Sequence, residues 1–248
     1  QGELRQRQFG HAVRLEVADN CTEKMSAFLL EQFHLKPQDL YPVNGPVNLA
    51  RMMQVPDMVD RPDLKYPLYR ATLSRELDKN SDLFAVLGKQ DILLHHPFQS
   101  FAPVVGLLQQ AANDKAVIAI KMTIYRAGEN SVLMDSLIQA ARSGKEVSVV
   151  LELKARFDEE TNIAWASKLE DAGAHVVYGV VGHKTHAKML LIVRREEGVL
   201  RRYAHVSTGN YHIRTANFYT DFGLMTANDA ICEDINAVFM QLTGLGNP

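Results

Sequence analysis

The sequence is poor in the residues and runs that mark specialised classes of protein. Its 248 residues include only two cysteines, Cys21 and Cys232, which excludes a disulfide scaffold and fits a reducing compartment. It has no apolar run of about 18 residues, the length that a membrane-spanning helix needs, and its first residues lack the apolar stretch of a secretory signal. We therefore expect a cytoplasmic protein without a transmembrane segment, and peripheral association with a membrane stays open.

Charge and missing motifs exclude further classes. With 27 basic and 29 acidic residues the net charge is −2, which argues against nucleic acid as a partner, because general affinity for it usually needs a basic excess. The sequence has no Gly-x-x-x-x-Gly-Lys-Ser/Thr loop of the P-loop kinases and no cysteine–histidine cluster with zinc spacing. Hydrophobic residues make up 46% of the chain, which is ordinary for a globular protein.

Proline marks a division of the chain. Six of the nine prolines lie between residues 37 and 67, a composition typical of loops and short helices between domains. Before them, residues 9–17 alternate as a strand does, and residues 22–33 have helical spacing behind Thr22, a predicted N-cap.

We accordingly expect residues 1–75 to be the end of one domain with its linker, and residues 76–248 to be a second domain. The start without methionine and the abrupt end at Pro248 suggest a piece of a longer protein.

The second part alternates strands with helices. Apolar runs predict strands at 91–94, 116–125, 146–153, 175–178, 188–193, 199–205 and 222–226. Helical spacing predicts helices at 98–112, 131–142, 161–172 and 228–242, with Gly144 and Gly173 ending two of them. This order indicates an α/β fold with a mainly parallel sheet and an antiparallel portion among the late strands.

Basic residues recur where the predicted strands end. Thirty residues separate Arg126 from Arg156, and a further 30 separate Arg156 from His186. Successive βα units would bring the three to one edge of the sheet, where function collects in parallel α/β folds. An arginine after a strand is often only a solvated loop residue, but three cations at a shared edge favour a polyanion, and phosphate above all.

His186-Ala187-Lys188 is the most pointed local motif. A His-x-Lys before an apolar strand is half of the signature of the phospholipase D superfamily, in which the histidine attacks phosphorus and the lysine holds phosphate oxygens. The aspartate of that signature would fall at Val193, which is not acidic. Downstream, Ser207-Thr208-Gly209-Asn210 resembles the superfamily's small-residue and asparagine element.

Several other residues are weaker candidates. His95 and His96 end the first predicted strand of the second part, and His183 precedes His186 by three residues. The acidic run 158–160 could help to hold a hydrated cation, but acids are also favoured at a solvated helix N-terminus.

Longer strings of the sequence resemble one known family, polyphosphate kinase of the first type. The matching strings are 91–101 (DILLHHPFQSF), 120–126 (IKMTIYR), 152–160 (ELKARFDEE), 182–189 (GHKTHAKM), 205–212 (HVSTGNYH) and 215–221 (TANFYTD). The resemblance implies a phospholipase D-like mixed sheet flanked by helices, preceded by the end of a helical middle domain. It also implies that a second C-terminal domain of this family, with its own histidine, is absent here, so that we expect this chain alone to be inactive.

The resemblance assigns roles to residues. His186 falls on the histidine that becomes phosphorylated, and Lys188 would hold phosphate oxygens beside it. Arg126 and Arg156 fall on positions associated with magnesium. Because Mg²⁺ prefers oxygen ligands, we read them as holding phosphate beside the metal. Tyr219 falls on a tyrosine associated with ATP, and His183, Asn210, His95 and His96 are possible supporting residues.

The function so implied is reversible transfer of the terminal phosphate of ATP to inorganic polyphosphate, with ADP as product and Mg²⁺ as cofactor. The family is typically homo-oligomeric. Two alternatives stay open: a phospholipase D-like phosphodiesterase or nuclease, which would need a second His-x-Lys, and a non-catalytic module that binds polyanions.

Overall fold

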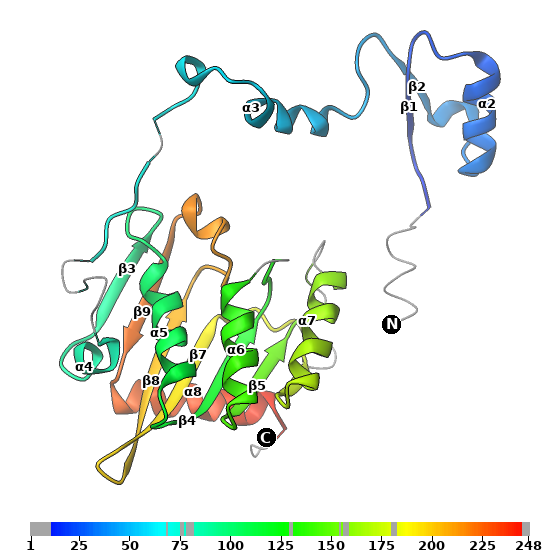
Figure 1. The fold of residues 1–248 in the computed structure, drawn as a ribbon. Helices are drawn as coiled ribbons and strands as arrows, with labels where there is room; N and C mark the ends of the chain where they lie inside the picture. Colours follow the sequence, from blue (N-terminus) through cyan, green and yellow to red (C-terminus); the bar gives the residue numbers. More distant parts are fainter. Residues whose placement is uncertain are drawn as a thin grey trace. The chain divides into compact units, whose positions relative to one another are not determined.

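A computed structural model describes residues 11–67, 69–74, 77, 82–128, 131–153, 155, 159–179 and 183–244. The chain divides into two compact units, residues 1–69 and 70–248. The domain boundary predicted between residues 75 and 76 falls outside the described residues. Figure 1 shows the elements of both units, coloured along the sequence.

The first unit is a small assembly of short elements. Its order is β1 (Leu15–Ala18), α2 (Glu23–Gln32), η1 (Pro37–Asp39), β2 (Leu40–Val43), η2 (Leu49–Gln54), α3 (Val55–Met58) and η3 (Pro62–Leu64). Thr22 is the N-cap of α2, as predicted, and its hydroxyl accepts a hydrogen bond from the Met25 amide at 3.3 Å. The strand predicted from Phe9 begins only at Leu15 among the described residues.

The proline-rich segment contains a strand that we did not predict. β2 pairs in parallel with β1, and Pro42 lies within it, opposite Val17. Proline has no amide hydrogen for the ladder, so it is tolerated only where that hydrogen has no partner strand to reach. A two-stranded sheet offers such an edge.

The second unit is built on a seven-stranded sheet. Its elements are α4 (Leu83–Leu87), β3 (Ile92–His96), α5 (Ala102–Asn113), β4 (Val117–Ile124), α6 (Val132–Arg142), β5 (Glu146–Leu151), α7 (Glu159–Asp171), β6 (His175–Tyr178), β7 (Met189–Glu196), β8 (Val199–Ser207), η4 (Thr215–Asn217), β9 (Asp221–Thr226) and α8 (Asp229–Leu242). The strand order is β3-β9-β8-β7-β4-β5-β6. The predicted mixed α/β sheet flanked by helices is confirmed.

The balance of strand directions differs from the expectation. Only the pairs β4–β5 and β5–β6 are parallel. The pairs β3–β9, β9–β8, β8–β7 and β7–β4 are antiparallel. The prediction of a mainly parallel sheet was therefore wrong, because β7, β8 and β9 follow one another without helices long enough to cross over.

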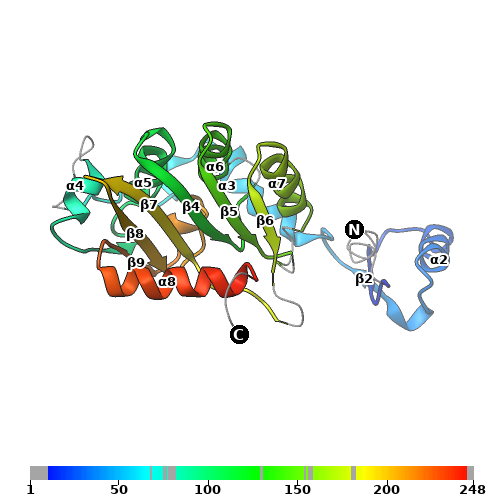
Figure 2. The ribbon, with the colours of Figure 1, turned by 90° about the horizontal axis from the view of Figure 1, so that it is seen from below.

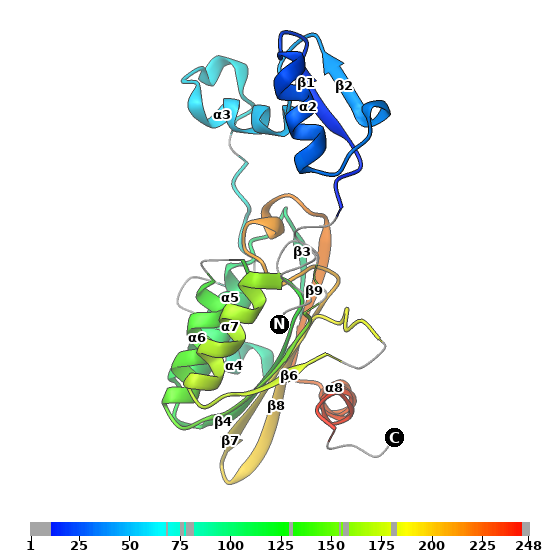
Figure 3. The ribbon, with the colours of Figure 1, turned by 90° about the vertical axis from the view of Figure 1, so that its right-hand side faces the viewer.

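Helices cover both faces of the sheet. Helices α4 to α7 lie on one face and α8 lies alone on the other (Figures 2 and 3). The larger core forms under α4 to α7, with Leu94, Leu107, Ile120, Leu137 and Tyr203 among its buried members. A smaller core forms between the sheet and α8 around Leu191, Ala204 and Phe239.

Helix α6 shows how local sequence sets these layers. Leu133, Leu137 and Ala140 recur at helical spacing and are buried against the sheet, as the apolar stripe of an amphipathic helix must be. Ser131 caps its N-terminus by accepting a hydrogen bond from the Met134 amide. The chain leaves the helix at Gly144, whose φ of +83° favours glycine.

The strands of the sheet begin and end at two opposite edges. We call the site edge the one where β3, β4, β5, β6 and β8 end and where β7 and β9 begin. We call the opposite one the hairpin edge, because the β7–β8 turn closes it at the bottom of Figure 1.

Within the described ranges, no helix combines the length and the apolar character needed to cross a membrane.

Candidate active site

His186 and Lys188 lie together at the site edge. Lys188 immediately precedes β7, and its ammonium nitrogen Nζ lies 3.0 Å from both ring nitrogens of His186. Only an unprotonated ring nitrogen can accept a hydrogen bond from this ammonium. The His186 side chain is exposed, whereas Lys188 retains only 6% of its exposure. The histidine thus faces solvent above a lysine that is nearly buried.

Backbone contacts fix the segment that carries this pair. The Thr123 hydroxyl of β4 donates to the Ala187 carbonyl at 2.8 Å and accepts from the Met189 amide at 2.9 Å. On the other side, the Ser207 amide of β8 donates to the Lys188 carbonyl at 3.0 Å. The residues on both sides of Lys188 are therefore held by neighbouring strands.

A second set of contacts fixes the residues before His186. Glu152, which is 3% exposed, follows β5 and accepts a hydrogen bond from the Thr185 amide at 2.7 Å. Asn162 of α7 donates from Nδ2 to the carbonyls of Tyr125 and Glu152 at 3.1 and 3.0 Å. These contacts join the ends of β4 and β5 to the loop that ends in His186.

The surroundings of His186 favour the neutral form of its imidazole. Partial burial lowers its pKa below the ordinary value, and the ammonium groups of Lys188 and Lys184 lower it further. The Tyr125 ring meets the His186 ring edge to face at 4.9 Å. A neutral imidazole beside cations is suited to attack an electrophilic phosphorus in an anionic substrate.

Burial also lowers the pKa of Lys188, but for a lysine this disfavours the charged form that would attract an anion. Desolvation lowers the pKa of its ammonium group, and the charge of Asp221 counteracts this effect by raising it. Asp221 is therefore the acid that favours the charged form of this lysine.

Arg126 reaches the same edge by following a strand, as the sequence suggested. It follows β4, and extending the β4–β7 register Met122↔Leu190 by four residues places it opposite His186. His186 lies in the loop that follows β6, the third parallel strand, and it directly precedes Ala187 and Lys188 at the start of the connection into the antiparallel strand β7. Arg156, the third member of the predicted set, lies outside the described residues.

The turn after β8 brings Asp221 into the site. The Thr208 hydroxyl donates to Asp221 Oδ1 at 2.8 Å and accepts from the Phe222 amide at 3.0 Å. A Cβ atom added to Gly209 would lie 2.5 Å from Asp221 Oδ2, so the carboxylate occupies the space that a side chain at 209 would need. The small-residue element seen in the sequence therefore makes room for an acid.

The two histidines of β3 face opposite sides of the sheet. His96 is buried, at 2% exposure, and its Nδ1 donates to the Gln99 carbonyl at 2.9 Å. His95 stacks on Phe222 with ring centroids 4.4 Å apart. Alternation along a strand forbids both from serving one site, and His96 is the one paired with Asp221.

The remaining candidates lie around the edge without contacting His186. His183 is exposed, and Tyr219, which is 61% exposed, lies two residues before β9. Asn210 has a buried side-chain oxygen without a hydrogen-bond partner in the described part of the chain.

Sequence reasoning missed residues that organise the site. Thr123, Glu152, Asn162 and Asp221 were given no role. A signal existed for one of them, because Thr123 is a hydroxyl residue in a mostly apolar strand. The other three act through contacts that depend on the fold.

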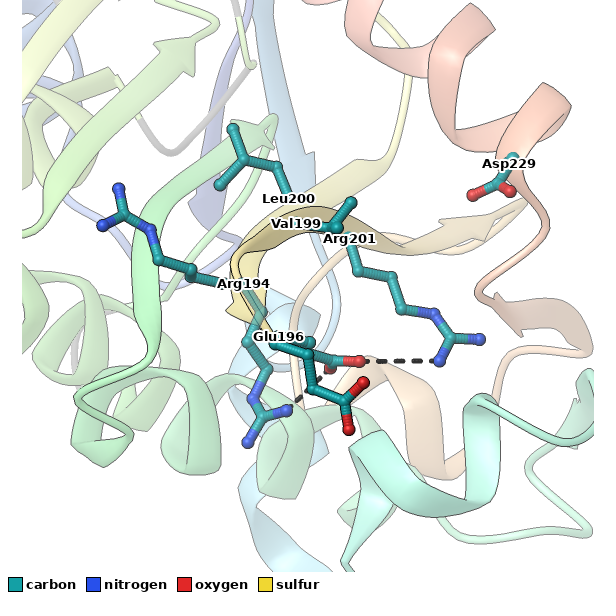
Figure 4. Close-up of a pocket in the computed structure, with 8 residues that line it drawn as sticks. Arg194, Glu196, Val199, Leu200, Arg201 and Asp229 are labelled. Carbon is teal, nitrogen blue, oxygen red and sulfur yellow. Dashed lines mark hydrogen bonds and ion pairs between the residues drawn. The ribbon is translucent and has the colours of Figure 1, made fainter.

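A groove at the hairpin edge is also lined by charged residues. Its lining includes Arg194, Glu196, Arg201 and Asp229 (Figure 4). Arg194 pairs with Asp114 and Glu196 at 2.7 Å each, and Arg201 lies 3.5 Å from Glu196. Arg194, Arg201 and Glu196 are thus already engaged in ion pairs, so we do not assign a substrate to this groove.

The described residues do not build a protein cage for magnesium. They contain no group of three or more histidine, cysteine or acidic side chains that could hold a metal ion. A guanidinium group has no lone pair to donate, so Arg126 cannot be a ligand. These residues fit a metal that is carried by phosphate and water.

Fold and site together define a mixed α/β domain with an exposed, neutral histidine among cations. Comparison with known proteins gives the family. Residues 82–248 match the family model of polyphosphate kinase C-terminal domain 1, and residues 1–55 match that of the polyphosphate kinase middle domain. The chain therefore belongs to the polyphosphate kinase family.

Individual relatives agree with this membership. The chain is 56% identical over 248 residues to a polyphosphate kinase of Neisseria meningitidis serogroup C, covering 100% of this chain and 36% of the relative. It is 60% identical over 250 residues to one of Burkholderia ambifaria, covering 99% and 36%. The crystal structure of the Porphyromonas gingivalis polyphosphate kinase matches 95% of this chain and 36% of that one, with 32% identity and a TM-score of 0.75. The chain thus spans about a third of the length of these relatives.

Proposed function

We propose that this chain carries the phosphohistidine site of a polyphosphate kinase, which transfers the terminal phosphate of ATP reversibly to inorganic polyphosphate. The observation that carries the proposal is the pair at the site edge: an exposed His186 whose imidazole is kept neutral, with the Lys188 ammonium 3.0 Å from its ring nitrogens. The names of the relatives supply the substrate class.

The first half-reaction forms the phosphoenzyme. An unprotonated ring nitrogen of His186 attacks the γ-phosphorus of ATP in line, the N–P bond forms, and the bond from phosphorus to the β,γ-bridging oxygen breaks as ADP leaves. Lys188 and Arg126 offset the charge on the phosphoryl oxygens. Arg156 is proposed for the same role on the strength of the family resemblance. Magnesium, when bound to the nucleotide, would neutralise part of the same charge.

The second half-reaction returns the histidine. A terminal oxygen of polyphosphate attacks phosphorus, the new P–O bond forms, and the N–P bond to His186 breaks. Because a phosphoramidate has a high transfer potential, the reverse direction to ATP is also accessible. Tyr219, exposed beside the start of β9, is proposed to contact ATP, with His183 and Asn210 in support.

The test is phosphoenzyme formation. Because the chain spans only part of its relatives, it would replace the matching segment of the Neisseria meningitidis enzyme, and this chimaera would be incubated with γ-labelled ATP. We expect acid-labile, base-stable label that is lost in His186→Ala. His175→Ala is the matched control, because His175 is an exposed histidine of β6, and it should keep the label. Label that persists in His186→Ala would contradict the assignment.

The same material separates the alternative functions. A binding module without catalysis would bind tripolyphosphate and remain unlabelled in the active chimaera. A phosphodiesterase would cleave a diester substrate and leave ATP intact. For residues 1–248 alone we expect little or no polymer, and robust chain elongation by them would show that the catalytic apparatus is complete in this chain.

A further inference from the structure

The His-x-Lys motif lacks its aspartate, because position 193 is valine. On the proposed function, the site still needs an acid, since a nearly buried lysine loses its charge unless a negative group opposes desolvation. The fold brings one candidate to the lysine from a strand far along the chain.

The sheet register puts Asp221 and Lys188 on the same face. Leu190 and Met225 both belong to the core under α4 to α7. Because side chains alternate along a strand, Lys188 at the start of β7 and Asp221 at the start of β9 face that same side. Between them lies β8, whose Ser207 pairs with Gly223 and donates its amide to the Lys188 carbonyl.

Strand β8 lies between Lys188 and Asp221, and the residue two positions after it is a glycine that leaves space for the Asp221 carboxylate. Gly209 follows β8, and the Asp221 carboxylate lies on it so closely that an added Cβ would come within 2.6 Å of Asp221 Cγ. The Gly209 backbone does not need a left-handed φ, so space is the reason for glycine here. The acid therefore lies against the backbone that follows β8, on the side of β9, and β8 separates it from the strand that Lys188 precedes.

The orientation of the carboxylate is fixed on one side only. Thr208 donates to Oδ1 at 2.8 Å, and Oδ2 has no hydrogen-bond partner among the described residues. One oxygen is thus anchored and the other is left to act on the charges nearby.

We propose that Asp221 is the acidic positioning residue of this site: it acts across Gly209 to keep the Lys188 ammonium charged and directed at the phosphoryl group on His186. It would stand in for the aspartate that is missing at Val193. The proposal rests on the proposed function for the phosphoryl group, but not for the effect of Asp221 on Lys188.

The other charged groups around Lys188 do not replace Asp221. In its own segment, His186 is neutral and Lys184 is a like charge. Arg126 follows β4 and is again a cation, with Tyr125 beside it. Glu152 after β5 is engaged by the Thr185 amide, and His96 at the end of β3 binds the Gln99 carbonyl.

The first experiment measures the lysine itself, without nucleotide. In the 248-residue chain with isotope-labelled lysine, the Lys188 signal would be assigned by its loss in Lys188→Arg and then titrated by NMR. We expect the pKa of Lys188 to fall further in Asp221→Asn and to stay unchanged in Asp229→Asn, which removes the same charge at the hairpin edge. A Lys188 titration that is the same in Asp221→Asn and in the parent chain would overturn the proposal, whatever the fate of the proposed function.

The second experiment measures the consequence for phosphoryl transfer. In the chimaera, Asp221→Asn should lower the rate of phosphohistidine formation on the order of ten-fold at alkaline pH, with a smaller loss near neutrality. Asp221→Glu should recover part of that rate. A loss that is equal at all pH values, or that added Mg²⁺ restores, would instead make Asp221 a structural or metal-binding residue and would overturn the positioning role.

A second variant covers the case in which Asp221→Asn does not fold. Gly209→Ala keeps the acid but displaces its carboxylate, because a methyl group cannot fit 2.5 Å from Asp221 Oδ2. The Lys188 pKa should fall in this variant too, by less than in Asp221→Asn. An unchanged titration in folded Gly209→Ala would contradict the geometry on which the proposal stands.

Discussion

The two edges of the same sheet use cations in opposite ways. At the hairpin edge, Arg194 and Arg201 lie against Asp114 and Glu196 in a closed set of ion pairs. At the site edge, Lys184, Lys188 and His186 lie together, and within the described residues neither lysine forms an ion pair. Cations that are paired with carboxylates are neutralised by them, whereas unpaired cations at a fixed place are available to bind an anion. The contrast separates the part of the sheet whose charges pair with one another from the part that we propose to bind substrate.

The pKa values follow the same division. At the hairpin edge, burial alone would raise the pKa of Asp114, but the hydrogen bonds from Arg194 and the Ala116 amide hold it below the ordinary value. At the site edge, burial lowers the pKa of Lys188 and only Asp221 opposes it. The contacts at the hairpin edge therefore favour the ionised form of Asp114. At the site edge, burial disfavours the charged form of Lys188 and Asp221 counteracts this effect.

The largest expected effect comes from removing the cation of the site edge. In Lys188→Met, phosphohistidine formation should fall roughly 100-fold or more, because a preorganised charge next to the transferred group is lost. The free energy of unfolding should stay the same or rise, since an apolar chain of similar length replaces a desolvated ammonium group. Labelling by ATP in the chimaera and urea unfolding of the chain measure the two quantities.

Lys184→Met is the matched control for this prediction. Lys184 is exposed and lies 5.4 Å from the Tyr125 ring centroid, so its loss should slow labelling much less. If Lys188→Met loses stability and keeps its rate of labelling, the site edge would be no different from the hairpin edge.

The second largest expected effect is a loss of folding stability at acidic pH, and it concerns the buried His205 of β8. His205 is fully buried beneath Gly223, with its Nδ1 2.9 Å from the Tyr211 hydroxyl. Burial first, and His96 second, lower the pKa of His205 from 6.5 to about 3. The unfolded imidazole gains a proton below its ordinary pKa and the folded one does not, so stability is lost as pH falls through this window. Between pH 7 and pH 5 the loss amounts to about 2 kcal/mol.

The measurement is urea unfolding of the parent chain and of His205→Asn at both pH values. Asparagine keeps a polar group near Tyr211 but does not titrate, so the decline between pH 7 and pH 5 should be smaller in the variant by about the same 2 kcal/mol. Equal declines in both proteins would show that His205 is not held neutral. The carboxylates of the hairpin edge, whose pKa values are lowered, should lose their contribution only at a more acidic pH.

Part of this contrast was readable in the sequence, and part was not. His186 and Lys188 stand two residues apart before an apolar run, so a local motif was enough to find them. The long apolar strands and capped helices were found for the same reason, since their signals lie within about ten residues. The short α4, with only five residues, gave no periodic signal.

What escaped prediction depends on pairing between distant segments. Thr123 contacts Met189 across 66 residues, and Asp221 reaches the site only because β9 lies beside β8. The share of parallel pairs in the sheet was also overestimated, because apolar runs of 4 to 8 residues look alike in parallel and antiparallel strands. A local motif was enough to propose His186 as the nucleophile, whereas the acid that we propose to support Lys188 could be found only from the topology.

The smallest of these effects tests the hairpin edge directly. Arg194→Met removes a cation that pairs with Asp114 and Glu196 and lies 5.2 Å from the Phe84 ring centroid. Its side chain is 26% exposed, so solvent screens the pairs in part, and we expect a loss of about 1 to 2 kcal/mol in the free energy of unfolding. Arg195→Met, at the exposed neighbouring position, should change stability by less than about 0.5 kcal/mol. Both variants should label with ATP in the chimaera at the parent rate, because neither residue is at the site edge. A slowed label in Arg194→Met at unchanged stability would mean that the paired arginine also serves the substrate, and the division between the two edges would then have to be abandoned.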